Sequence, residues 1–198
     1  MMRLVLASTS QFRSAILTAM GFSFEARAPE FHEVGEGSPQ ELARAFAEGK
    51  ARSLEHLEDA WVVGADQTLE LDGEALRKPG SPEEMHAQLQ RLSGHEHALH
   101  SALFVLRTDD GRSAARLVTT RLRMRTLSDA EITQYLALDA PHGAVGSYLY
   151  EQRGRLLFDD VVGSDDSAIV GLPVVPLFSA LRGLGFDAFQ ALQDAGSR

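Results

Sequence analysis

The chain has 198 residues, 44% of them hydrophobic and 24% charged, which is the composition of an ordinary globular protein. We therefore expect one domain over residues 1–198, large enough to bury a proper core. The net charge of −9 argues against binding of nucleic-acid polymers or anionic membranes. The absence of cysteine excludes disulfides, thiolate metal sites and a cysteine nucleophile, and it fits a cytoplasmic location.

The first element is a short apolar strand at residues 4–7, followed by a turn rich in hydroxyl groups and a helix over 14–20. This order directs unpaired backbone N–H groups and the positive end of a helix at one point, where an anion such as phosphate binds well. Ser8, Ser10 and Arg13 are the candidate ligands. An alternative stays open, in which Ser10 only caps the helix and Arg13 is solvated.

The next segment reads as a strand over 22–26, a loop over 28–33 that carries acidic residues, and a helix that begins after Ser38. Apolar residues recur with helical spacing as far as Leu54. Lys50 lies beside this apolar stripe, where lysines usually extend outward into solvent.

A buried strand over 61–66 ends in Asp66. Functional groups gather at the carboxyl ends of strands in open α/β sheets, so Asp66 is a candidate catalytic or metal-binding acid. A turn aspartate that caps local backbone is the equal alternative. A hairpin over 69–76 with an Asp-Gly turn then leads to Lys78 in an extended segment.

The second half predicts a helix after Ser81, a long antiparallel pair over 95–106 and 115–125, and a helix after Ser128. A short strand over 148–151 and a final helix over 174–181 follow. Three histidines stand on the first long strand, but His95 and His97 share a face that His100 does not, so we do not expect a histidine metal site.

These segments, in this order, resemble the Maf family of nucleoside triphosphate pyrophosphatases along nearly the whole chain. The matching residues are Leu6-Ala7-Ser8-Thr9-Ser10 with Arg13, Ala28-Pro29-Glu30 with Glu33, Lys50-Ala51, Gly64-Ala65-Asp66, Lys78-Pro79, Ser93-Gly94 with His97, Gly146-Ser147-Tyr148 and Val170-Gly171-Leu172-Pro173. The resemblance implies an α/β fold whose central twisted mixed sheet is flanked by helices, with two lobes around one cleft. It also implies a homodimer.

The implied reaction converts a nucleoside triphosphate to the monophosphate and pyrophosphate with Mg²⁺ or Mn²⁺. Asp66 would accept the proton of the attacking water, and Lys50 and Lys78 would neutralise the triphosphate. Ser8, Ser10 and Arg13 would bind phosphates. Glu33 and Asp66 would hold the cation through oxygen ligands, as hard cations prefer.

Three further positions concern the base: Phe12, Gln67 and Glu151. Their combination is similar to the branch of the family that acts on 7-methyl-GTP. An aromatic face attracts the positive ring of a methylated guanine, and a carboxylate suits the donor edge of guanine. The alternatives are a dTTP/UTP or broad-specificity enzyme of the same family, and a nucleotide-binding regulator of cell division with little turnover.

The chain also departs from the family pattern. His32 stands where the family often has aspartate, which leaves Glu30 as a substitute for that acid. Ala144 stands where a lysine is common, Ser101 where a threonine is usual and Ser167 where an asparagine is usual. The first two changes bear on the metal and phosphate sites more than on the fold.

Overall fold

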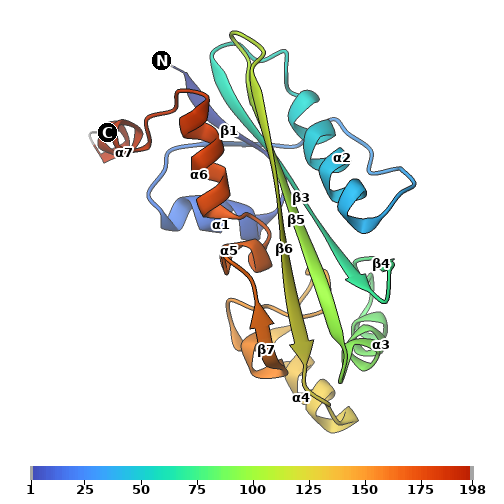
Figure 1. Ribbon diagram of the computed structural model, residues 1–198. Helices are drawn as coiled ribbons and strands as arrows, with labels where there is room; N and C mark the ends of the chain where they lie inside the picture. The colour runs from blue at the N-terminus through green and yellow to red at the C-terminus, as the bar shows by residue number, and fades with distance from the viewer. Residues whose placement is uncertain (1, 197–198) are drawn as a thin grey trace.

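The structure is a computed structural model that describes residues 2–196, and it is built on one seven-stranded mixed sheet with the order β2-β1-β3-β5-β6-β7, in which β4 pairs with β3 (Figure 1). The strands are β1 Arg3–Ala7, β2 Glu25–Arg27, β3 Ala60–Leu71, β4 Glu74–Leu76, β5 Glu96–Arg107, β6 Ser113–Met124 and β7 Phe158–Val162. β1 pairs in parallel with β2 and β3, and the remaining pairs are antiparallel. The predicted α/β fold with a mixed sheet is therefore confirmed.

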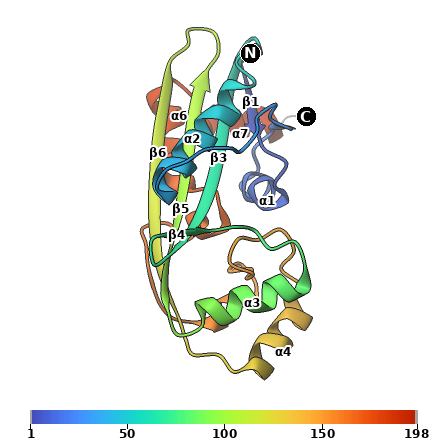
Figure 2. The same cartoon turned by 90° about the vertical axis from the view of Figure 1, so that its right-hand side faces the viewer.

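Helices cover the two faces of this sheet differently along its length. They are α1 Gln11–Ala19, α2 Pro39–Arg52, α3 Pro82–Leu92, α4 Asp129–Asp139, α5 Ser167–Val170, α6 Val174–Gly183 and α7 Ala188–Gly196, with a 3₁₀ turn η1 at Arg153–Leu157. In the upper half, α2 packs on one face while α1 and α6 pack on the other (Figure 1). In the lower half, α3 and α4 lie side by side (Figure 2). No helix within residues 2–196 is long and apolar enough to cross a membrane.

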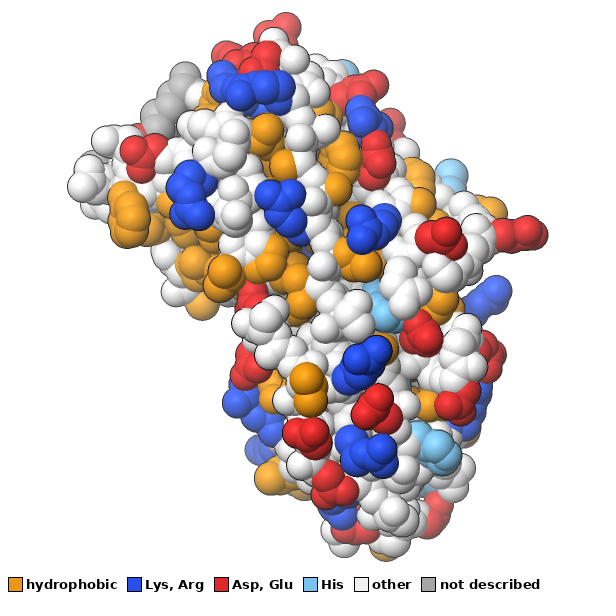
Figure 3. All heavy atoms as spheres, in the orientation of Figure 1, with side chains coloured by type: hydrophobic (Ala, Val, Ile, Leu, Met, Phe, Trp, Pro, Cys, Tyr) orange, Lys and Arg blue, Asp and Glu red, His pale blue; other side chains and the backbone are white. Residues whose placement is uncertain are grey.

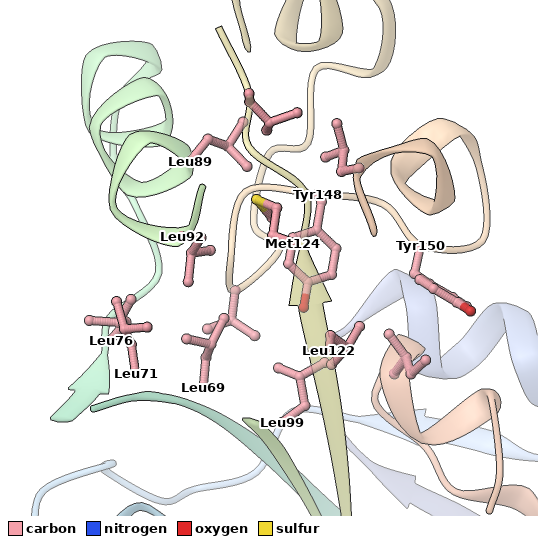
Figure 4. Close-up of a cluster of buried hydrophobic side chains, with 14 of the residues drawn as sticks. Leu69, Leu71, Leu76, Leu89, Leu92, Leu99, Leu122, Met124, Tyr148 and Tyr150 are labelled. Carbon is pink, nitrogen blue, oxygen red and sulfur yellow. The ribbon is translucent and has the colours of Figure 1, made fainter. Parts of the chain in front are cut away.

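Three hydrophobic clusters hold these layers together. Two of them lie on opposite faces of the upper sheet, beneath α2 and beneath α1 and α6. The third forms the core of the lower half, where Met124 of β6 and Tyr148 lie beside the leucines of α3 (Figure 4). β3, β5 and β6 are each 12 residues long and run through both halves, so the sheet is continuous between them.

The charged side chains of β6 are dispersed. Arg121 and Arg123 are exposed and alternate with the buried Leu122 and Met124, and Arg116 is exposed further along the strand. In the view of Figure 3, basic and acidic side chains are both scattered over the visible surface, and the surface narrows between the upper and lower halves.

Three predicted strands differ from the structure. The strand expected over 61–66 continues as far as Leu71, so Asp66 lies within β3 and not at its end. The strand expected over 22–26 is formed by Glu25–Arg27 only, because Phe22 instead packs against Phe178 in the core beneath α6. The strand expected over 148–151 is a buried turn. Its alternating pattern arises because Tyr148 and Tyr150 both enter the lower core.

Candidate active site

The turn between β1 and α1 forms one wall of a groove. Ser10 caps α1 by accepting a hydrogen bond from the backbone N–H of Arg13 at 3.5 Å. Ser8 Oγ accepts from the backbone N–H of Ser10 at 3.1 Å and from Arg13 Nη1 at 3.2 Å. Arg13 Nε donates to the carbonyl of Gly171 at 3.0 Å. Ser10 both caps α1 and lines the groove, so its capping role is compatible with the expected role in phosphate binding.

Arg13 is a buried cation with only 8% of its surface exposed. Burial lowers the pKa of its guanidinium, while the charges of Asp66 and Glu33 act in the opposite direction. An arginine stays protonated in proteins, so the turn carries a fixed positive charge.

Lys50 is not solvated, contrary to the usual behaviour of lysine, and it is only 6% exposed. Its ammonium lies 2.5 Å from Asp66 Oδ1 and 2.6 Å from Glu33 Oε1. The reason is local packing. A Cβ on Gly64 would lie 2.1 Å from the carbonyl oxygen of Ala47, so α2 contacts β3 directly there. Since Asp66 follows Gly64 on the same face of β3, the side chain of Lys50 meets its carboxylate.

The two carboxylates that contact Lys50 differ in electrostatic environment. Burial raises the pKa of Asp66, and Lys50 and Arg13 oppose that effect only partly. Burial alone would raise the pKa of Glu33 too, but Lys50, Lys78 and Arg13 together lower it below its usual value. A raised pKa is what a carboxylate that accepts a proton requires.

Lys78 extends toward the same groove from the segment after β4. Desolvation and the nearby charge of Arg13 lower its pKa. Arg13, Lys50 and Lys78 therefore converge on one region from three separate elements.

Gln67 points to the other face of β3, away from Asp66. Its amide nitrogen donates to Ser101 Oγ at 2.8 Å, to the Ala168 carbonyl at 2.7 Å and to the Ile169 carbonyl at 3.1 Å. Carbonyls only accept hydrogen bonds, so these contacts fix the orientation of the amide. Gln67 also lines the groove, so its oxygen is the amide atom left to accept a hydrogen bond there.

The groove has two continuous parts that share Ser10, Phe12, Arg13, Lys78 and Gly143. One part, a hollow of about 530 Å³, is lined by further charged and hydroxyl side chains, including Ser8, Glu33 and Lys50. The other part is a slot of about 40 Å³. Its further lining residues are Gln67, Ala144, Val145, Tyr148, Leu149, Tyr150, Glu151, Ile169, Val170 and Gly171. It lies between α1 of the upper half and the loop over 143–151 of the lower half.

The sequence-predicted residues thus all lie in the groove or on its walls, except Asp66, which lies behind Lys50. Glu30 is exposed and lines neither part, and Ala144 lines the slot in place of a longer side chain. The role of the Gly171 carbonyl, which fixes Arg13, was not predicted from the sequence. The Gly-Leu-Pro segment was the available signal, since glycine after a short helix allows the left-handed φ of 109° found there.

The family model for Maf-like protein matches residues 3–184. A protein from Cupriavidus pinatubonensis named 7-methyl-GTP pyrophosphatase is 38% identical over 193 residues, covering 96% of each chain. Proteins with the same name from Xanthomonas campestris and Burkholderia thailandensis are 39% and 36% identical, over 94% and 96% of this chain and 98% and 91% of their own lengths. This chain belongs to the Maf family.

Proposed function

We propose that this protein hydrolyses a nucleoside triphosphate to the monophosphate and pyrophosphate, with 7-methyl-GTP as preferred substrate. The observation that carries the proposal is a single groove with a cationic end and an end that presents hydrogen-bond acceptors. Relatives that match almost the whole chain and bear the name 7-methyl-GTP pyrophosphatase support the same assignment.

At the cationic end, Arg13 and Lys78 bind the phosphates, and the hydroxyls of Ser8 and Ser10 donate further hydrogen bonds. A triphosphate carries several negative charges, so three converging cations offset the cost of bringing it into a partly buried groove. Lys50 serves this purpose as well when its ammonium turns from the carboxylates toward the substrate.

Asp66 accepts the proton of the attacking water. The water oxygen forms a bond to the α-phosphorus while the bond from that phosphorus to the oxygen bridging to the β-phosphorus breaks. Pyrophosphate leaves with the electron pair of that bond. Because pyrophosphate is a good leaving group, positioning and charge neutralisation supply most of the rate.

The donor set fits a divalent cation such as Mg²⁺ or Mn²⁺, to be held by Glu33 and Asp66. Their carboxylates already converge on one positive charge, the ammonium of Lys50. No group of three or more metal-ligating side chains is found within residues 2–196. Two carboxylates completed by water and phosphate oxygens are a usual arrangement for Mg²⁺. When bound, the cation adds positive charge at the phosphates.

At the acceptor end, the Gln67 oxygen and the Glu151 carboxylate receive the N1–H and amino groups of guanine. Phe12, which is half buried between the two parts of the groove, offers its ring to the base. The methylated base carries a positive charge, and an aromatic face attracts such a charge more than it attracts a neutral ring.

The test is a panel of nucleotides with Mg²⁺ or Mn²⁺, with pyrophosphate and orthophosphate measured separately, on the parent protein and Asp66→Asn. We expect 7-methyl-GTP to give pyrophosphate with the highest kcat/KM. Asp66→Asn should lower kcat by about 10²- to 10⁴-fold, the usual contribution of a general base, yet still bind nucleotide. Asp72→Asn, the same change at an exposed turn, is the control.

Each other result contradicts a stated part of the proposal. Orthophosphate as first product rejects the reaction. Highest activity on dTTP or UTP rejects the base preference but not the reaction. Tight binding without turnover by the parent protein indicates a nucleotide-binding regulator instead.

A further inference from the structure

Gln88 of α3 joins the two walls of the groove through one buried side chain. Its Oε1 accepts a hydrogen bond from Ser147 Oγ at 2.7 Å, and its Nε2 donates to the Arg77 carbonyl at 2.9 Å. The residue is 9% exposed and does not line the groove. We call these two hydrogen bonds the Gln88 bridge.

One end of the Gln88 bridge holds the loop over 143–151. Ser147 is fully buried with a φ of 59°, and Gly146 before it has a φ of 86°. A left-handed conformation is costly for a residue other than glycine, so surrounding contacts must hold it in place. A Cβ on Gly146 would lie 2.6 Å from the Tyr148 ring, which leaves the loop little room to adjust.

The residues around this strained pair form one wall of the slot. Val145 and Tyr148 through Glu151 line it, and Glu151 is the proposed reader of the base. The backbone N–H of Leu149 donates to the Tyr135 hydroxyl at 2.8 Å, so the loop is held at a second point from α4. The position of the base-reading wall therefore depends on buried polar contacts behind it.

The other end of the Gln88 bridge holds the residue before Lys78. Arg77 to Pro79 is an extended segment outside the regular strands. Lys78 lines both parts of the groove from this segment. A hydrogen bond to the Arg77 carbonyl fixes the backbone from which the Lys78 side chain extends.

We infer that Gln88 is a positioning residue that sets the spacing between the base-reading wall and the phosphate-binding Lys78. The inference rests on the proposed function, because it assigns those roles to the two walls. A side chain that bonds both walls makes the placement of the base and of the triphosphate depend on each other. Small misplacements of this kind reduce turnover strongly without removing any group that touches the substrate.

The test compares Gln88→Met, which keeps the length of the side chain but loses both hydrogen bonds, with Ser147→Ala, which loses only the bond to the loop. Gln90→Met is the matched control, since Gln90 lies on the same helix with an exposed side chain. Inorganic tripolyphosphate as a competitive inhibitor reports on the phosphate end alone.

We expect Gln88→Met to lower kcat/KM for 7-methyl-GTP by about tenfold or more and to weaken inhibition by tripolyphosphate. Ser147→Ala should lower kcat/KM for 7-methyl-GTP but leave tripolyphosphate inhibition unchanged. The double variant should match Gln88→Met, because the bond that Ser147→Ala removes is already lost. Gln88→Glu still accepts a hydrogen bond from Ser147. Its ratio of kcat/KM for 7-methyl-GTP to kcat/KM for UTP should therefore be closer to that of the parent protein than the ratio of Gln88→Met is.

Kinetics equal to those of Gln90→Met would overturn the inference, as would a loss of thermal stability with unchanged kinetics. Additive effects in the double variant would also overturn it. The proposed function fails separately, if the parent protein releases no pyrophosphate. In that case the bridge is tested by the Kd of 7-methyl-GTP and of tripolyphosphate on the same variants. If Gln88→Met does not fold, Ser147→Ala and Gln88→Glu test the two ends.

Discussion

Glu151 is the side chain on which the proposed base preference depends most directly. It is exposed at the mouth of the slot, while the other proposed acceptor, Gln67, is fixed within it by three hydrogen bonds. The two residues differ in how substitution acts. A change at Gln67 disturbs α5 as well, whereas a change at Glu151 alters mainly the chemistry offered to a ligand.

We expect Glu151→Gln to lower kcat/KM for 7-methyl-GTP by about 10- to 100-fold, because a pair of hydrogen bonds to a base edge is worth about 1–3 kcal/mol. The kcat/KM for UTP should stay within about threefold of the parent value, a change no larger than the loss of one weak hydrogen bond. Steady-state kinetics on both substrates measure the ratio, with Glu36→Gln in an exposed loop as control. Equal losses on both substrates would reject the base-reading role.

His97 is a buried neutral residue in the lower core. Its Nε2 contacts the Tyr148 hydroxyl at 3.0 Å, while its Nδ1 is buried without a hydrogen-bond partner. Burial lowers its pKa from 6.5 to about 4. The unfolded chain therefore binds more protons than the folded chain at mildly acidic pH.

From this we expect the free energy of unfolding to fall as the pH drops from about 6.5 to about 4, by roughly 3 kcal/mol in total. Above about pH 6.5, His97 is neutral in both the folded and the unfolded chain, so its titration no longer changes the free energy of unfolding. Urea denaturation at several pH values measures it. His97→Gln should flatten the slope, and the exposed His95→Gln should not. An unchanged slope in His97→Gln would show that another group titrates.

The contact between α2 and β3 is the element-scale feature on which the proposed catalytic residues depend. Gly64 allows the backbone of α2 to approach the strand, and this approach brings Lys50 to Asp66. The capping box of Ser38 and Glu41 fixes where α2 begins, and Thr68 donates to the Pro39 carbonyl at 2.8 Å. Helix start and strand register together set the position of Lys50.

Gly64→Ala should therefore reduce both stability and turnover. The added Cβ would meet the Ala47 carbonyl oxygen at 2.1 Å and the Ala51 nitrogen at 2.7 Å, so the helix must shift. We expect a loss of about 1–3 kcal/mol in urea denaturation, the usual cost of overpacking. Gly183→Ala, where nothing lies within 4 Å, is the control and should not reduce either quantity. A stable, fully active Gly64→Ala would refute this account.

The elements that the sequence predicts well are those whose pattern is local. The capping boxes of α2 and α4, the apolar stripe of α2, and the Asp-Gly turn between β3 and β4 are encoded by neighbouring residues. β7 was not predicted, because Phe158–Val162 carries two exposed aspartates and forms a strand through pairing with β6. α7 was not predicted either, and none of its residues is buried.

The same division applies to the site. A hydroxyl-rich turn indicated Ser8, Ser10 and Arg13. The reason that indicated Asp66 was wrong, because the expected strand end is absent and β3 continues to Leu71. The burial of Lys50 depends on a glycine in another element, and family resemblance alone assigned it a role. Gln88 gave no signal, since a glutamine beside Leu89 looks like an ordinary helix residue until its two distant partners are known.

For the whole molecule, three long strands connect the upper and lower halves. Trp61 is the sole tryptophan and lies in the core beneath α6, whereas all three tyrosines lie in the lower core. Because β3, β5 and β6 contribute to both cores, we propose that residues 1–198 behave as one folding unit.

Unfolding in urea should then give the same midpoint whether it is followed by Trp61 fluorescence or by the near-ultraviolet signal of the tyrosines. Tyr135→Phe, which removes the hydroxyl that accepts from Leu149, should shift both midpoints together. Two separate transitions, or a shift confined to the tyrosine signal, would show that the halves unfold independently.

The hydrogen bond from Arg13 to the Gly171 carbonyl joins residues that are 158 positions apart. During synthesis, the turn proposed to bind phosphate is therefore made long before the segment after β7, and it stays incomplete until that segment has emerged from the ribosome. Closing so long a loop is slow relative to forming the local helices and hairpins. A nascent chain that ends at Ser164 has a hydroxyl turn without the carbonyl that orients its arginine. The proposed activity should therefore require that the segment carrying Gly171 has folded back onto α1.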